Sequence, residues 1–156
     1  MKSNPQALFF DTGVLVALFS RDPPERPTAD AVLAYIRKYP HASRHVVFPS
    51  LVELFYKTLH ELSPKDVRTN LDALAITVFP PGPSEEKLIF GSYTSSGYKG
   101  EFDFADYFVC RAALMFPHSE VLTIDRRDLP LALSRATQHV FENHGVSHGL
   151  TLVPFP

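Results

Sequence analysis

Four acidic residues follow apolar segments at wide intervals along this chain, and acids in such places could bind a metal ion. They are Asp11, Glu53, Asp106 and Asp125. Crowded carboxylates repel one another and raise one another's pKa, so a cluster of them is stable only when it binds cations or protons. Oxygen ligands favour Mg²⁺ or Mn²⁺, and these ions assist in-line attack on phosphodiesters. If the fold brings the four acids together, the chemistry that they predict is metal-dependent phosphodiester hydrolysis.

Asp11 is the only charged residue in the apolar stretch 7–19. Residues 8–10 are typical of a short buried strand, and residues 14–19 of the start of an internal helix. A carboxylate at the carboxyl end of a parallel strand lies where open α/β sheets bind ligands. Asp is also a favoured N-cap residue, so this stretch alone fits both a functional acid and a helix cap.

The other three acids also fall at the ends of strands or the starts of helices. Ser50 and Glu53 have the spacing of a capping box, which is a structural alternative to a role for Glu53 in a site. Asp103 and Asp106 have the same spacing, and we expect Asp103 to cap the helix and Asp106 to face the site. Asp125 directly follows an apolar segment that we predict to be a strand.

Strand and helix patterns alternate along the chain, which predicts one α/β domain over residues 1–156. The predicted strands are 8–10, 45–48, 76–79, 120–124 and 150–153, and the predicted helices are 14–19, 28–39, 51–62, 64–75, 84–93, 102–113 and 131–141. Right-handed crossovers between parallel strands put helices on both faces of the sheet. We therefore expect a three-layer α/β/α fold with a central, mainly parallel sheet, and all four acids at its carboxyl edge.

Composition is that of an ordinary globular protein, with 45% hydrophobic and 21% charged residues. No apolar run approaches the roughly 20 residues of a membrane span, no signal peptide is evident, and the single Cys110 allows no internal disulfide. These features predict a cytoplasmic protein with Cys110 in its core. Without the four acids, 13 acidic residues remain against 15 Lys and Arg, a mildly basic balance that suits a polyanionic partner.

Four segments in this order resemble the motifs of PIN-domain ribonucleases, in particular the toxins of the VapC type. They are Phe10-Asp11-Thr12 with the apolar helix after it, Ser50-Leu51-Val52-Glu53-Leu54, the segment Asp106 to Ala113, and Thr123-Ile124-Asp125-Arg126-Arg127-Asp128-Leu129. The resemblance implies a PIN-like fold, a toxin that cleaves RNA, and Mg²⁺ or Mn²⁺ bound by Asp11, Glu53, Asp106 and Asp125. It also implies supporting roles for Thr12, Thr123, Asp103 and Asp128, a small antitoxin protein as partner, and a homodimer.

Some features depart from that family's pattern. Bulky Tyr107, Phe108 and Arg111 stand where the family has small or aliphatic residues, and Ile124 stands where a polar residue is common. The tail carries His139, His144 and His148, whose spacing matches no metal site, so we expect exposed loop histidines.

Basic residues are spread over the chain, and we expect most of them on solvated helix faces. Arg126 and Arg127 adjoin Asp125 and could contact an RNA backbone. Apolar positions in 32–36 and 51–59 could form a groove for an inhibitor, although amphipathic helices normally bury such faces.

Two other functions fit parts of the sequence. An aspartyl-phosphate phosphatase also has an Asp after its first strand, but Gly13 stands where its second Asp would be. A PIN-like subunit that binds without catalysis is the other alternative.

Overall fold

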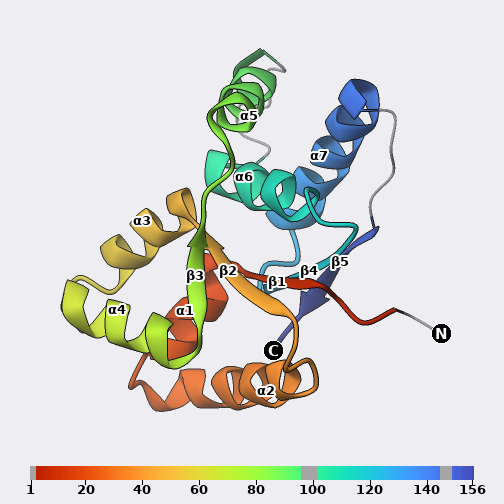
Figure 1. Ribbon diagram of the computed structural model, residues 1–156. Helices are drawn as coiled ribbons and strands as arrows, with labels where there is room; N and C mark the ends of the chain where they lie inside the picture. Colours follow the sequence, from red (N-terminus) through yellow and green to blue (C-terminus); the bar gives the residue numbers. More distant parts are fainter. Residues whose placement is uncertain (1–2, 96–101, 145–148) are drawn as a thin grey trace.

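Five parallel strands form a central sheet in the computed structural model, which describes residues 3–95, 102–144 and 149–156 (Figure 1). The strands are β1 (Ala7–Phe10), β2 (Ser43–Val47), β3 (Ile76–Phe79), β4 (His118–Thr123) and β5 (Gly149–Pro154). The helices are α1 (Thr12–Phe19), α2 (Arg26–Arg37), α3 (Phe48–Lys57), α4 (Pro64–Ala73), α5 (Pro83–Ser95), α6 (Phe104–Ala113) and α7 (Asp128–His144), and a short 3₁₀ helix, η1 (Pro23–Glu25), precedes α2. The predicted α/β fold with a parallel sheet is confirmed.

The strand order is β3-β2-β1-β4-β5, so the chain builds outward from β1 in one direction and then returns to build in the other. This reversal creates a switch point between β1 and β4, which pair directly along Ala7–Phe10. In open α/β sheets, ligands bind outside the carboxyl ends of the strands at such a point. The strand order therefore favours a ligand site beside the residues that follow β1 and β4.

Helices cover both faces of the sheet and make three layers (Figure 1). Alternate residues of β1 point to opposite faces, as the period of a strand requires. Leu8 and Phe10 pack with apolar side chains of α1 to α4, whereas Ala7 and Phe9 pack with those of α5 to α7. All four are fully buried, which explains why β1 is an uninterrupted apolar run.

The predicted strands and helices all occur, with shifted ends. β2 stops at Val47 and α3 begins at Phe48, three residues before the predicted start, with Pro49 in its first turn, where the fixed φ of proline is favourable. Ser63, Pro64 and Asp66 predict a helix start from the sequence, and Ser63 forms a complete capping box with Asp66 at the start of α4. Residues 94–100 are polar and predict a loop, but residues 94 and 95 belong to α5, and residues 96–100 lie outside the described part of the chain.

Helix α6 is enclosed on every side, since all residues from Tyr107 to Ala113 are buried. Cys110 is a core residue, as predicted. Arg111 is an exception to the solvated helix faces expected for most basic residues, because the sheet lies on one side of α6, and α5 and α7 lie on the other (Figure 1). Arg111 Nη1 donates to the Tyr107 hydroxyl at 2.9 Å, and that hydroxyl shares a 2.6 Å hydrogen bond with His139 Nδ1.

The prediction of exposed loop histidines is therefore wrong for His139, which lies half-buried in α7. The backbone of His144 ends the same helix, while its side chain and all of His148 lie outside what is described.

Candidate functional site

Asp11 ends β1 and caps α1, and its carboxylate is fixed on both oxygens. Oδ1 accepts a hydrogen bond from the Thr12 amide at 2.8 Å, and Oδ2 accepts one from the Thr123 hydroxyl at 2.9 Å. The side chain is buried, and this burial raises its pKa from 3.8 to about 6. The two hydrogen bonds lower the pKa, while the charges of Asp125 and Glu53 raise it further. The interpretation of Asp11 as a helix cap is confirmed, and its carboxylate also lies within electrostatic range of Asp125 and Glu53.

Glu53 lies on the second turn of α3 and faces α1. Its Oε2 accepts a hydrogen bond from the Thr12 hydroxyl at 2.9 Å, and its Oε1 pairs with Lys57 at 2.8 Å. The capping-box alternative for Glu53 is wrong, because the N-cap residue of α3 is Val47 and Ser50 lies within the helix. The Ser50 hydroxyl is buried and has no hydrogen-bond partner in the described part of the chain.

Asp106 lies in the first turn of α6, where Asp103 is the N-cap. Asp103 Oδ1 accepts a hydrogen bond from the Asp106 amide at 2.9 Å, so the predicted division between cap and site acid is confirmed for the cap. Burial raises the pKa of Asp106 to about 8, and the charges of Asp103, Asp11, Asp125 and Glu53 raise it as well. Asp106 therefore lies within electrostatic range of the other three predicted acids.

Asp125 follows β4 and leads the chain into α7. Its amide donates to the Thr123 hydroxyl at 2.8 Å, and its Oδ1 accepts from the amides of Arg127 at 2.8 Å and Asp128 at 3.0 Å. These bonds hold the turn at the end of the strand. Asp128 thus supports Asp125 through its backbone.

The two threonines link the acids into one chain of hydrogen bonds. The Thr123 hydroxyl joins Asp11 to the backbone of Asp125, and the Thr12 residue joins Asp11 to Glu53 through its amide and its hydroxyl. The chain crosses from α3 to α1, β1 and β4 at the carboxyl edge of the sheet. Hydroxyls in these places keep the carboxylates at fixed positions despite their mutual repulsion.

The residue types at this site suit a cation, but the arrangement of their side chains within the described residues does not form a metal site. Four carboxylates with two raised pKa values offer the oxygen ligands and the negative charge that suit Mg²⁺ or Mn²⁺. Yet within residues 3–95, 102–144 and 149–156, no three acidic, His or Cys side chains are arranged to hold a metal ion. Glu53 is instead paired with Lys57, and Asp125 with two amides. The residue types fit a hard cation, and Glu53 and Asp125 hold other partners.

Two features of the site were not predicted from the sequence. Lys57 partners Glu53, and the signal was available, because the two residues are four apart on one helix. Gly13 lies under the side chain of Ile124, where an added Cβ would come within 2.8 Å of Ile124 Cγ1. The branched Ile124 and the glycine therefore form a matched pair across the switch point.

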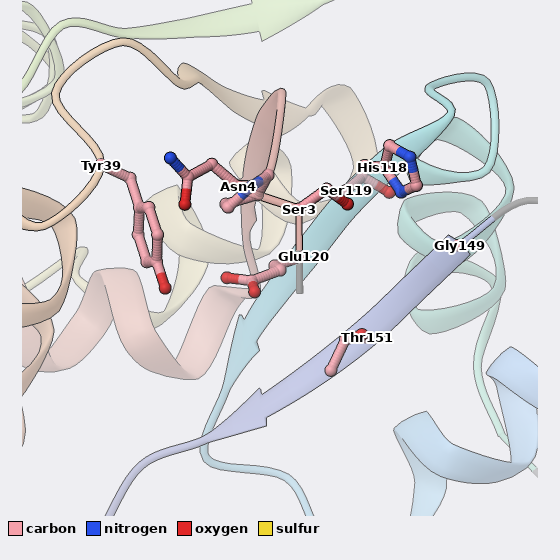
Figure 2. A pocket seen from close by; sticks show the side chains of 9 residues that line it. Ser3, Asn4, Tyr39, His118, Ser119, Glu120, Gly149 and Thr151 are labelled. Carbon is pink, nitrogen blue, oxygen red and sulfur yellow. The ribbon is translucent and has the colours of Figure 1, made fainter. Parts of the chain in front are cut away.

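Two cavities lie at opposite edges of the sheet. One adjoins the acids at the carboxyl edge and is lined by Thr123, Asp125, Arg126, Pro130, Leu152 and Pro154. The other lies at the amino ends of β4 and β5 and is lined partly by Tyr39, His118, Glu120 and Thr151 (Figure 2). Its carboxylate, Glu120, accepts a 2.5 Å hydrogen bond from the Tyr35 hydroxyl, and this bond and burial raise the pKa of Tyr35. None of the four site acids lines the second cavity.

No family model matches the chain, and no curated protein matches it in sequence. None of the helices that the structure describes is long and apolar enough to cross a membrane. Fold and site together define an α/β protein with an acid cluster at the switch point of a parallel sheet.

Proposed function

We propose that this chain is a divalent-metal-dependent endoribonuclease of the PIN-domain type, which hydrolyses RNA phosphodiester bonds at the acid cluster. The observation that carries the proposal is the electrostatics of Asp106, whose pKa of about 8 reflects burial and four neighbouring carboxylates. Such crowding costs stability unless a cation neutralises it. Clusters of perturbed acids at a ligand-binding edge are typical of functional sites.

Asp11, Glu53, Asp106 and Asp125 would hold Mg²⁺ or Mn²⁺. When bound, the cation would supply Lewis-acid chemistry, which neutralises charge on the phosphate and makes water a better nucleophile. The chain's own contribution is positional. Asp11 is fixed by Thr12 and Thr123 and cannot swing away, while Glu53 is shared between Thr12 and Lys57.

Positive side chains near the acids would bind the RNA backbone. Lys57 lies next to Glu53, and Arg126 and Arg127 are exposed in the turn that follows Asp125. Phosphate contacts of this kind fix the position of a nucleic acid and carry no sequence information. These three cations would therefore increase the affinity for RNA without selecting its sequence.

The proposed context is that of a cytoplasmic toxin with a small antitoxin protein and a second copy of the chain as partners. Four apolar side chains on and just after α3 support a protein interface, being more than half exposed: Phe48, Val52, Tyr56 and Leu59. Helix α2 follows the other alternative given for these apolar positions, because Val32 and Ile36 are buried in the core and cannot line a groove. Phe55 is partly buried against that core, so the exposed surface is the opposite side of α3.

The test is to measure Mn²⁺ binding by calorimetry and cleavage of a fluorescent single-stranded RNA. Asp106→Asn should lose cleavage and weaken Mn²⁺ binding, because it removes one carboxylate of the cluster. Asp30→Asn is the matched control, since it makes the same charge change at an exposed position on α2. Equal cleavage by the wild type and Asp106→Asn would contradict the proposal.

The alternatives receive less support. An aspartyl-phosphate phosphatase needs a free nucleophilic carboxylate, but both oxygens of Asp11 are engaged in hydrogen bonds. A binding subunit without catalysis has no need for four charged acids at a switch point. Mn²⁺ binding without RNA cleavage would favour that alternative.

A further inference from the structure

We infer that the cavity beside Asp125 is a subsite for one unpaired nucleobase, next to the place where the acid cluster would hold the phosphate that water attacks. This inference rests on the proposed function. The cavity measures about 290 Å³, enough for a single base, and Asp125 belongs both to its wall and to the acid cluster. A nucleotide with its phosphate at the acids would therefore have this cavity within reach of its own base or of the neighbouring one.

The cavity lies between the edge strand β5 and the first turn of α7. Leu152 and Pro154 are two residues apart on β5 and so share one face of the strand. Pro130, from α7, lies across from them, and Arg126 stands exposed beside them. The wall is therefore apolar at Pro130, Leu152 and Pro154 and carries one cation, Arg126, a combination that suits a base attached to a phosphate.

Two polar groups of the cavity wall, the Thr123 hydroxyl and Asp125 Oδ1, are already engaged, and Arg126 is the cation assigned above to the RNA backbone, which limits how a base would be recognised. The Thr123 hydroxyl donates to Asp11 and accepts from the Asp125 amide, and Asp125 Oδ1 accepts from two further amides. Recognition would therefore be by contact with the face of the ring, which every base has. We expect weak sequence preference at this position.

A base can enter the cavity only when it is unstacked and unpaired. Proteins recognise such splayed bases in single-stranded RNA, whereas paired bases in a duplex are held in the helix. The subsite therefore predicts a preference for single strands over duplexes of the same sequence.

The experiment compares short single-stranded RNAs with one abasic position moved along the sequence. In the wild type with Mn²⁺, loss of the base at one position flanking the cleaved bond should raise KM at least about 5-fold, or about 1 kcal/mol, with little change in kcat, because Pro130, Leu152 and Pro154 offer apolar contact to the ring. Abasic sites elsewhere should have smaller effects. A wild type that cleaves all these RNAs with equal KM would overturn the inference.

Two variants at adjacent positions of α7 separate the cavity from general charge effects. Pro130→Glu puts a carboxylate into the cavity, and a glutamate in the first turn of a helix is well tolerated. Leu131→Glu makes the same addition at an exposed neighbour that does not line the cavity. Pro130→Glu should raise KM for the intact RNA and abolish the effect of the abasic position, while Leu131→Glu keeps it. Retention of the full effect in Pro130→Glu would place the base elsewhere.

Binding of the same RNAs, labelled with fluorescein and measured by anisotropy in EDTA, distinguishes the two proposals. If the wild type cleaves no RNA, the nuclease proposal fails, and the subsite is judged by binding alone. Weaker binding of one abasic RNA by the wild type, lost in Pro130→Glu, supports the subsite. Equal binding of all RNAs by both proteins overturns it.

Discussion

Replacing Asp11 by Asn should stabilise the folded protein at neutral pH and lose this advantage in acid. Burial raises the pKa of Asp11 to about 6 from 3.8, so the folded protein holds this proton more tightly than the unfolded chain does. Stability therefore falls as the pH rises from about 4 to 6, because ionisation is easier in the unfolded chain. Asn cannot ionise and avoids this loss.

The size of the effect follows from the same pKa values. A difference of about two pH units corresponds to about 3 kcal/mol above pH 7, at about 1.4 kcal/mol for each unit. Asn keeps the oxygen that caps α1 but presents an amide to the Thr123 hydroxyl, and the lost hydrogen bond costs about 1 kcal/mol. The net gain is about 2 kcal/mol at pH 7.5, or roughly 4–8 °C in Tm for a domain of this size. At pH 4 the variant should be no more stable than the wild type.

The assay is thermal unfolding followed by circular dichroism at pH 4, 5, 6 and 7.5 in EDTA. The exposed Asp30→Asn variant serves as the control for loss of one negative charge and should follow the wild type at every pH. A Tm gain in Asp11→Asn that is the same at all pH values would refute the reasoning, since it would not arise from ionisation. A Tm below that of the wild type at pH 7.5 would show that the cap and the Thr123 bond dominate.

Three further predictions address the cluster, the buried arginine and the switch point. Mn²⁺ affinity, measured by calorimetry, should rise between pH 6 and 8, because the raised pKa of Asp106 makes a proton compete with the cation over this range; a flat affinity would exclude Asp106 as a ligand. Arg111→Met should leave Tm unchanged or raise it, because the guanidinium is buried, forms no ion pair within the described residues and leaves Nη2 without a hydrogen bond; a large loss of Tm would show that its bond to Tyr107 matters more. Gly13→Ala should lower stability by about 1–3 kcal/mol in urea unfolding, because its Cβ would overlap Ile124, and Ile124→Ala should restore much of the loss in the double variant; additive losses would argue against the contact.

The sequence predicted the parts of the fold that depend on local patterns. β1 and β3 are short apolar or β-branched runs bounded by turn residues, and the prediction for β3 matches its ends. The start of α3 was misplaced because Pro49 was interpreted as the end of a strand, whereas it also suits the first turn of a helix. That error made Ser50 look like a cap for Glu53. Pro49 fits both the end of a strand and the first turn of a helix. Packing decides between the two, and the local sequence pattern does not show that packing.

Arg111 shows a second limit of local pattern. Charged residues are solvated on most helices, and the sequence offers nothing to mark α6 as an exception. The exception arises from topology, because α6 lies between the sheet on one side and helices α5 and α7 on the other, which leaves no side of Tyr107 to Ala113 for solvent. Bulky Tyr107, in contrast, was noted as unusual, and its hydroxyl is the group that accepts the hydrogen bond from Arg111.

Local sequence predicted the place of each acid, whereas the expectation that the four meet at the carboxyl edge depended on the predicted fold. Each carboxylate follows a strand or starts a helix, and that much can be deduced from local sequence. The strand order then decides which of them meet, since β1 and β4 become neighbours only when the chain reverses after β3. Thr12 and Thr123 turn this proximity into a connected unit, because one hydroxyl joins Asp11 to Asp125 and the other joins the Asp11 end of α1 to Glu53. The hydroxyls hold the carboxylates of Asp11 and Glu53 and the backbone of Asp125 in place. For that reason the positions of the acids are a property of the fold, whereas their protonation is set by pH and by whatever cation they bind.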